Sequence, residues 1–80
     1  MGAYNNLGNI YYTVGKQDSA VMYYREALKR NPSLVDAHFN LGYIYYHKGL
    51  LKEAVGEFKK VIELDPDNYK AKIMLEKMVQ

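Results

Sequence analysis

The sequence predicts an all-α fold of five helices that pack as antiparallel pairs. A seven-residue phrase that begins at Asn6 recurs in closely similar form at Asn40, an offset of 34 residues (40 minus 6). Apolar residues recur at helical spacing, and no stretch shows the period-two alternation that indicates a half-buried strand. Glycines and Asn-Pro or Asp-Pro pairs divide the chain at matching places. A period of this length is typical of helical repeats, which generally offer a surface rather than a catalytic pocket.

The first two helices follow from this pattern. The first is expected over residues 2–14 and ends at Gly15, because glycine adopts the left-handed cap conformation without steric cost. The second is expected over residues 18–30 and ends before Pro32, which disfavours helical geometry in the residue that precedes it. Asp18 suits the positive N-terminal end of that helix. The apolar side chains expected to face inward are Ala3, Leu7, Ile10, Tyr11, Val14, Ala20, Val21, Tyr24, Ala27 and Leu28.

The other three helices repeat this order. Ser33 is expected to cap the third helix, which ends at Gly49. The fourth helix is expected over residues 52–64. The fifth is expected to be capped by Asp67 and to run from residue 69 to the end of the sequence. The side chains expected to face inward are Ala37, Leu41, Ile44, Tyr45, Ala54, Val55, Phe58, Val61, Ile62, Ala71, Leu75, Met78 and Val79.

Composition narrows the possible functions. The chain has 80 residues, a net charge of +2 and no cysteine, which excludes disulfides and thiolate metal sites. The charge is too weak to indicate nucleic acid or a membrane surface as a partner. No apolar run approaches the roughly 20 residues of a membrane span, and no signal peptide is evident, so a cytoplasmic location is favoured. Because the chain begins inside the first repeat, we expect it to be a fragment of a longer array.

The two halves pair small, aromatic, glycine and proline residues at matching positions. The pairs are Ala3/Ala37, Leu7/Leu41, Gly8/Gly42, Tyr11/Tyr45, Gly15/Gly49, Ala20/Ala54, Tyr24/Phe58, Ala27/Val61 and Pro32/Pro66. This set resembles the tetratricopeptide repeat family. The second repeat departs from the family pattern at His38, where an aromatic such as Tyr4 is usual, and at Val61, where alanine is usual. The resemblance implies one right-handed α-solenoid domain, divided into a first repeat at 1–34, a second at 35–68 and a C-terminal capping helix at 69–80.

Small residues at the predicted crossings should let paired helices approach closely. Gly8 and Gly42 remove side-chain bulk there, and large aromatic side chains are expected to fill the space beside the contact. In the last helix the matching position is Glu76, a charge where a further helix would have to pack. We therefore expect this helix to cap the solenoid. The first helix has no such cover, so its apolar edge is a candidate for self-association.

The resemblance also implies a concave groove, lined by the first helix of each pair, that holds a peptide or protein segment. Phe39, Tyr43 and Tyr46 would form one exposed aromatic row, which suits apolar side chains of a partner. Asn9 and Asn40 could hold a peptide backbone. The alternative is that the tyrosines only pack against neighbouring helices. The expected groove residues are Asn5, Asn9, Tyr12, Thr13, Phe39, Asn40, Tyr43, Tyr46, His47, Lys70, Ile73 and Lys77, with Met74 beside them.

Some members of the family bind C-terminal carboxylates through a clamp of lysine, asparagine and arginine. Asn9, Asn40 and Lys70 match clamp positions here. Asn5 and Met74 stand where the clamp has cations, which a carboxylate requires, so this function is not favoured.

Other chemistry has little support in the sequence. The two histidines, His38 and His47, lack the spacing of a metal site, and no hydroxyl has a recognisable histidine and carboxylate for catalysis. Lysines of the second half alternate with acidic residues, which favours a solvated face over a phosphate-binding track. RNA binding, known in related helical repeats, is disfavoured by the weak charge. We predict a non-enzymatic scaffold without a cofactor that binds a peptide or protein, or alternatively a self-association module that stacks through its terminal helices.

Overall fold

The computed structural model describes residues 2–78, and these form helices and turns without a strand. The prediction of an all-α fold is therefore confirmed. The expected bounds of the first, second and fourth helices agree with the observed ones to within one residue. Val79, expected on the buried face of the last helix, lies outside the described residues. The helices are α1 Ala3–Thr13, α2 Gln17–Arg30, α3 Val35–His47, α4 Leu51–Leu64 and α5 Tyr69–Met78.

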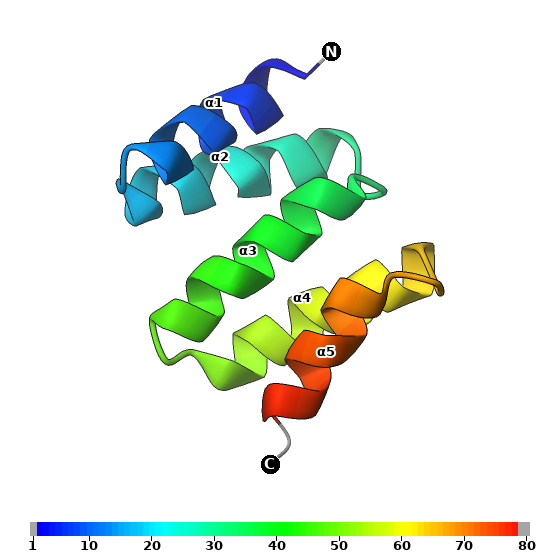
Figure 1. The fold of residues 1–80 in the computed structure, drawn as a ribbon. Coiled ribbons are helices and arrows are strands. Elements are labelled where there is room, and N and C mark those ends of the chain that lie inside the picture. Colours follow the sequence, from blue (N-terminus) through cyan, green and yellow to red (C-terminus); the bar gives the residue numbers. More distant parts are fainter. Residues whose placement is uncertain (1, 79–80) are drawn as a thin grey trace.

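The five helices stack in chain order (Figure 1). Helix α1 packs on α2, α2 on α3, α3 on α4, and α4 on α5, so that α1 and α5 lie at opposite ends of the stack. Helix α3 lies in the middle and contributes the most buried residues of any helix, among them Leu41 and Ile44. The core is thus centred on α3, the middle helix of the stack.

Two glycines end the first helix of each pair in the same way. Gly15 has φ 84° and Gly49 has φ 79°, both in the left-handed region. The Gly15 N–H donates to the Tyr12 carbonyl at 3.1 Å, and the next N–H, from Lys16, donates to the Tyr11 carbonyl at 2.8 Å. Equivalent bonds recur 34 residues later, and this pattern satisfies carbonyls that the helix end would leave unpaired. The predicted glycine stops are confirmed.

The predicted caps of α3 and α5 are wrong. Leu34, not Ser33, precedes α3, and it makes no side-chain cap hydrogen bond. The Ser33 N–H instead donates to Asn31 Oδ1 at 3.1 Å, inside the turn. At the matching position before α5, Asn68 Oδ1 accepts from the Ala71 N–H at 3.0 Å and therefore caps the helix in place of Asp67.

The helix crossings differ in detail from the prediction. An aromatic ring of the second helix fills the space above each crossing glycine, rather than lying beside a contact between backbones. A Cβ on Gly8 would lie 2.7 Å from ring atoms of Tyr24, and one on Gly42 would lie 2.9 Å from Cζ of Phe58. Tyr24 and Phe58 are fully buried. Glycine is thus required at these positions because the aromatic ring packs directly against the helix backbone.

The first helix is the least covered. Ala3, Ile10 and Val14 were expected to face inward, but all three are exposed, Ile10 by 57% and Val14 by 62%. Ile10 and Val14 lie at the outer end of the stack, where no neighbouring helix is present among the described residues, whereas Ala3 lines a pocket beside Ala27 of α2. The apolar stripe was correctly recognised, but α1, unlike α2, α3 and α4, packs against a described helix on one side alone.

Candidate functional site

The aromatic row on α3 is assembled largely as expected but is half-buried rather than exposed. The rings of Phe39 and Tyr43 stack with centroids 6.4 Å apart. Phe39 also packs edge-on against the core residue Phe58, at 5.3 Å. His47 continues the row, with its ring 4.5 Å from that of Tyr43 and 5.5 Å from that of Tyr46. The rings are therefore held in place by core contacts and by each other while part of each remains accessible.

Helix α1 adds a tyrosine to the same face. Burial raises the pKa of Tyr12, and the phenol of Tyr43 raises it further. Both rings are half-buried. Tyr12 on α1 and Tyr43 on α3 thus both pack against the same core cluster while part of each ring remains accessible.

The two expected groove asparagines meet at a buried tyrosine hydroxyl. Tyr24 Oη donates to Asn9 Oδ1 at 2.5 Å, while Asn40 Nδ2 donates to Tyr24 Oη at 3.0 Å and lies 3.3 Å from Asn9 Oδ1. Burial raises the pKa of Tyr24, with a smaller opposing effect from the Asn40 hydrogen bond. These amides therefore already link the two repeats, so a partner would meet side chains of fixed orientation.

Sequence reasoning missed the role of the Tyr24 hydroxyl, although a signal was present. The matching residue in the second repeat is Phe58, which fills the same position without a hydroxyl group. The counterparts of Asn9 and Asn40 there are Tyr43 and Met74, which cannot form the same network. A tyrosine that is replaced together with both of its amide partners indicates a polar cluster specific to one junction.

The remaining expected groove residues are less closely joined. Thr13 is exposed, and its hydroxyl donates to the Asn9 carbonyl at 2.8 Å within α1. Asn5 is half-buried on the first turns of α1. Met74, expected in the groove, is instead buried in the core with 7% exposure, because it lies on the face of α5 that covers α4. The three expected groove residues on α5 are exposed, and no described hydrogen bond or ring contact joins them to α1 or α3: Lys70, Ile73 and Lys77.

A second aromatic cluster, between α1 and α2, was not foreseen as a unit. Tyr23 stacks on Tyr11, with centroids 5.3 Å apart, and on Tyr4, at 6.3 Å. The Arg30 guanidinium lies 4.8 Å above the Tyr4 ring. This cluster stabilises the first helix pair and is separate from the α3 row.

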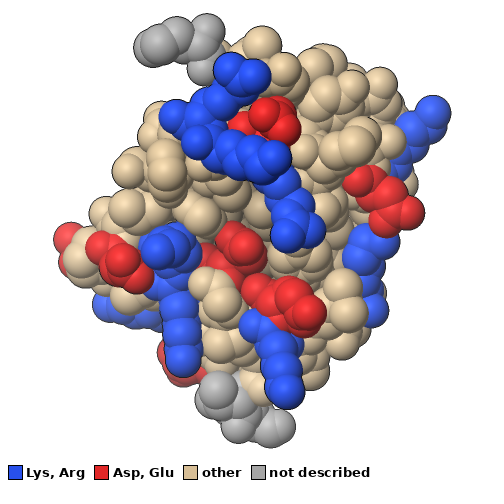
Figure 2. Space-filling view, turned by 180° about the vertical axis from the view of Figure 1, so that it is seen from behind, with Lys and Arg blue, Asp and Glu red and all other residues tan. Residues whose placement is uncertain are grey.

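The side of the molecule that faces away from the viewer in Figure 1 is highly charged. Figure 2 shows Lys and Arg side chains interleaved with Asp and Glu side chains over this face. Measured pairs include Arg30 with Glu26 at 3.7 Å and Lys60 with Glu63 at 3.8 Å. Such exposed pairs contribute little to stability and indicate a solvated surface.

Two further findings concern the described part of the chain. None of the helices there is long and apolar enough to cross a membrane. Residues 2–78 also contain no group of three or more histidine, aspartate or glutamate side chains placed to hold a metal ion.

Comparison with models of known protein families gives a match. A sequence model described as tetratricopeptide repeat matches residues 5–69, from α1 to the start of α5. A comparison with curated protein sequences finds no match.

Proposed function

Because the chain belongs to the tetratricopeptide repeat family, we propose that it binds a peptide or protein segment in a groove on the face formed by α1 and α3, with α5 at its edge. Repeats of this family generally mediate protein–protein interaction and are typically non-catalytic scaffolds. The proposal adds the place on this chain and the chemistry of the contact.

The half-buried aromatic row of Phe39, Tyr43 and Tyr46 is the observation that supports the site most strongly. Each ring is fixed on one side by the protein and partly accessible on the other. Rigid aromatic rings contribute much contact area at little cost in side-chain entropy, and they dominate binding energy at protein interfaces. Tyr12 on α1 packs against the same core cluster as these rings, and we include it in the proposed surface.

The amides of Asn9 and Asn40 support an extended peptide as the partner. Their hydrogen bonds to Tyr24 hold both side chains in place beside the aromatic row. Binding groups that are already ordered lose less entropy when a partner docks. An extended segment could thus place apolar side chains on the rings and its backbone beside the amides.

Selection from a random peptide library, followed by isothermal titration calorimetry, tests this proposal. We expect Tyr43→Ala and Tyr46→Ala to weaken the binding of a selected peptide at least about tenfold, since truncating an interface hot spot costs about 2 kcal/mol or more. Met22→Ala is the matched control, because Met22 is 61% exposed on α2, away from the row. Unchanged affinity in both tyrosine variants would contradict the proposal.

Self-association through the ends of the stack is a second candidate, with a second copy of this chain as the partner. The observation that favours it is the exposure of Ile10 and Val14 on α1 and of Tyr69 and Ile73 on α5, at opposite ends. Sedimentation velocity from micromolar to millimolar concentration tests it. We expect Val14→Glu to reduce association, and a protein that remains monomeric over the whole range would exclude this function.

A further inference from the structure

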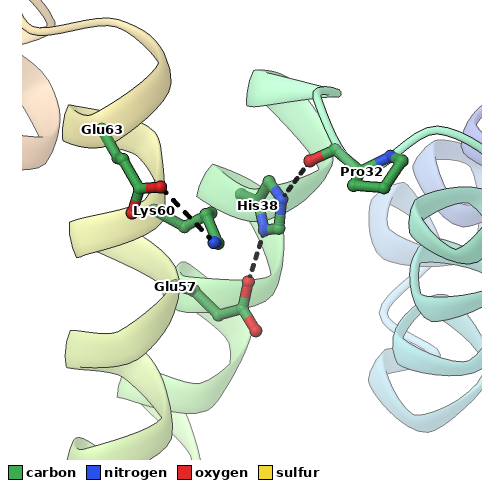
Figure 3. A network of polar contacts seen from close by, with 5 residues as sticks. All are labelled: Pro32, His38, Glu57, Lys60 and Glu63. Carbon is green, nitrogen blue, oxygen red and sulfur yellow. Dashed lines mark hydrogen bonds and ion pairs between the residues drawn. The ribbon is translucent and has the colours of Figure 1, made fainter.

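A buried histidine connects α3 to two neighbouring segments (Figure 3). His38 is 7% exposed on the first turns of α3. Its Nδ1 lies 2.7 Å from Oε1 of Glu57 on α4, and its Nε2 lies 2.8 Å from the carbonyl oxygen of Pro32 in the α2–α3 turn. Both ring nitrogens therefore face oxygen atoms at hydrogen-bond distance.

The number of protons in this arrangement follows from the atoms. A carbonyl oxygen only accepts, so Nε2 must carry a proton. If Glu57 is ionised, Nδ1 must carry a proton too, and the ring is then an imidazolium. If Nδ1 is bare, Glu57 must itself be protonated and donate to it. Either arrangement holds one proton more than a neutral histidine beside an ionised glutamate. With that proton absent, one ring nitrogen would point its lone pair at a lone pair of the oxygen it faces, on either Glu57 or Pro32.

We propose that His38 and Glu57 form a proton-linked pair that holds α3 to α4 and to the α2–α3 turn only while it carries this additional proton. In the unfolded chain an ordinary histidine loses its proton near pH about 6.5. Above that pH the folded state binds more protons than the unfolded state, so the free energy of unfolding falls as pH rises. Stability linked to the pair is fully present between the ordinary pKa values of glutamate and histidine, from about pH 4.3 to about pH 6.5, and is lost as the pair deprotonates at higher pH.

Other ionisable side chains lie around the pair. Glu53 and Lys60 lie one turn to either side of Glu57 on α4, and Lys60 pairs with Glu63 at 3.8 Å (Figure 3). The pKa of the neighbouring Tyr45 is raised mainly by burial. The charge of Arg25 on α2 lowers this pKa, and the charges of Glu57 and Glu53 raise it. Glutamate, lysine, arginine and tyrosine side chains ordinarily titrate outside the range from about pH 6 to about pH 9. On the α2–α3 turn, the contact to His38 is the uncharged Pro32 carbonyl.

Chemical unfolding as a function of pH tests the proposal. In the wild-type chain we expect the unfolding equilibrium constant to rise by up to about tenfold per pH unit above about pH 6.5, the limit for one linked proton. His38→Phe, which restores an aromatic at this position, should remove this dependence. Glu57→Gln should also remove it, because the glutamine amide can donate to Nδ1 of a neutral ring. His47→Gln is the control, since His47 is exposed, and it should leave the dependence in place.

A second measurement does not depend on whether the variants fold. The wild-type chain has two histidines, so NMR of the imidazole nitrogens can follow the protonation of each ring separately. We expect the His38 site to keep its additional proton at a pH where His47 has become neutral. Loss of the proton from both sites at the same pH, or an unchanged pH dependence in folded His38→Phe, would overturn the proposal.

Discussion

Replacement of Gly42 by alanine tests the packing between α3 and α4 most sharply. The new Cβ would lie 2.9 Å from Cζ of Phe58, and two further ring atoms would lie at 3.0 and 3.1 Å. The ring cannot move freely, because Phe58 is fully buried and packs edge-on against Phe39. We therefore expect the substitution to force a displacement of the core rather than a local adjustment.

The magnitude follows from two opposing terms. Overpacking a well-packed core costs about 1–3 kcal/mol. Alanine is also the better helix former, by about 1 kcal/mol. Gly56 isolates the second term, because it lies inside α4 and a Cβ there would meet no atom within 4 Å. The Gly42→Ala variant should thus be less stable than Gly56→Ala by about 1–3 kcal/mol.

Urea unfolding followed by far-ultraviolet circular dichroism measures this difference. We expect Gly56→Ala to be somewhat more stable than the wild-type chain and Gly42→Ala to be equal or less stable. If Gly42→Ala gained as much stability as Gly56→Ala, the ring of Phe58 could not occupy the space above Gly42, and the packing argument would fail.

Three further predictions concern helix ends and buried tyrosines. Gly49→Ala should lose roughly 1–2 kcal/mol in the same unfolding assay, although its Cβ would meet no atom within 4 Å, because φ is 79° there; full stability would contradict the left-handed cap. Asn68→Ala should lower the free energy of unfolding by about 1 kcal/mol, because α5 loses its cap. Ser33→Ala should change it by less than about 0.5 kcal/mol. A larger loss in Ser33→Ala than in Asn68→Ala would contradict the observed caps. Stability should also fall as pH rises above about 10, because burial raises the pKa of some tyrosines and the unfolded chain then ionises first. Ultraviolet titration of tyrosinate checks this, and ionisation of all tyrosines in one step would refute it. The tyrosines concerned are Tyr12, Tyr24 and Tyr45.

Repetition made most of the fold predictable from sequence. Gly15 and Gly49 marked helix ends because a left-handed residue is a local requirement that glycine meets best. The caps failed because Ser33 and Asp67 were judged by residue type, while the outcome depends on which side chain stands directly before the helix. That position is Leu34 before α3 and Asn68 before α5.

Burial was predicted less well on α1, which packs against α2 on one side and has no described helix on the other. Periodicity placed Ile10 and Val14 on one apolar side of α1, but it could not show whether another helix covers that side. The same limit applies to Met74, whose placement depends on the angle at which α5 meets α4.

The candidate site was predictable in outline and not in its polar contacts. The aromatic row follows from helical spacing, since Phe39 and Tyr43 are four residues apart on one helix. By contrast, His38 and Glu57 belong to different helices, and only folding places them 2.7 Å apart. Contacts of this kind depend on tertiary geometry that a single sequence pattern does not contain.

The most direct test of the proposed binding face is an NMR measurement of where a selected peptide contacts the protein. We predict nuclear Overhauser contacts from the peptide to the rings of Tyr12, Tyr43 and Tyr46, and none to the exposed Met22 on α2. Contacts confined to α2 and α4, with the aromatic row unaffected, would contradict this account.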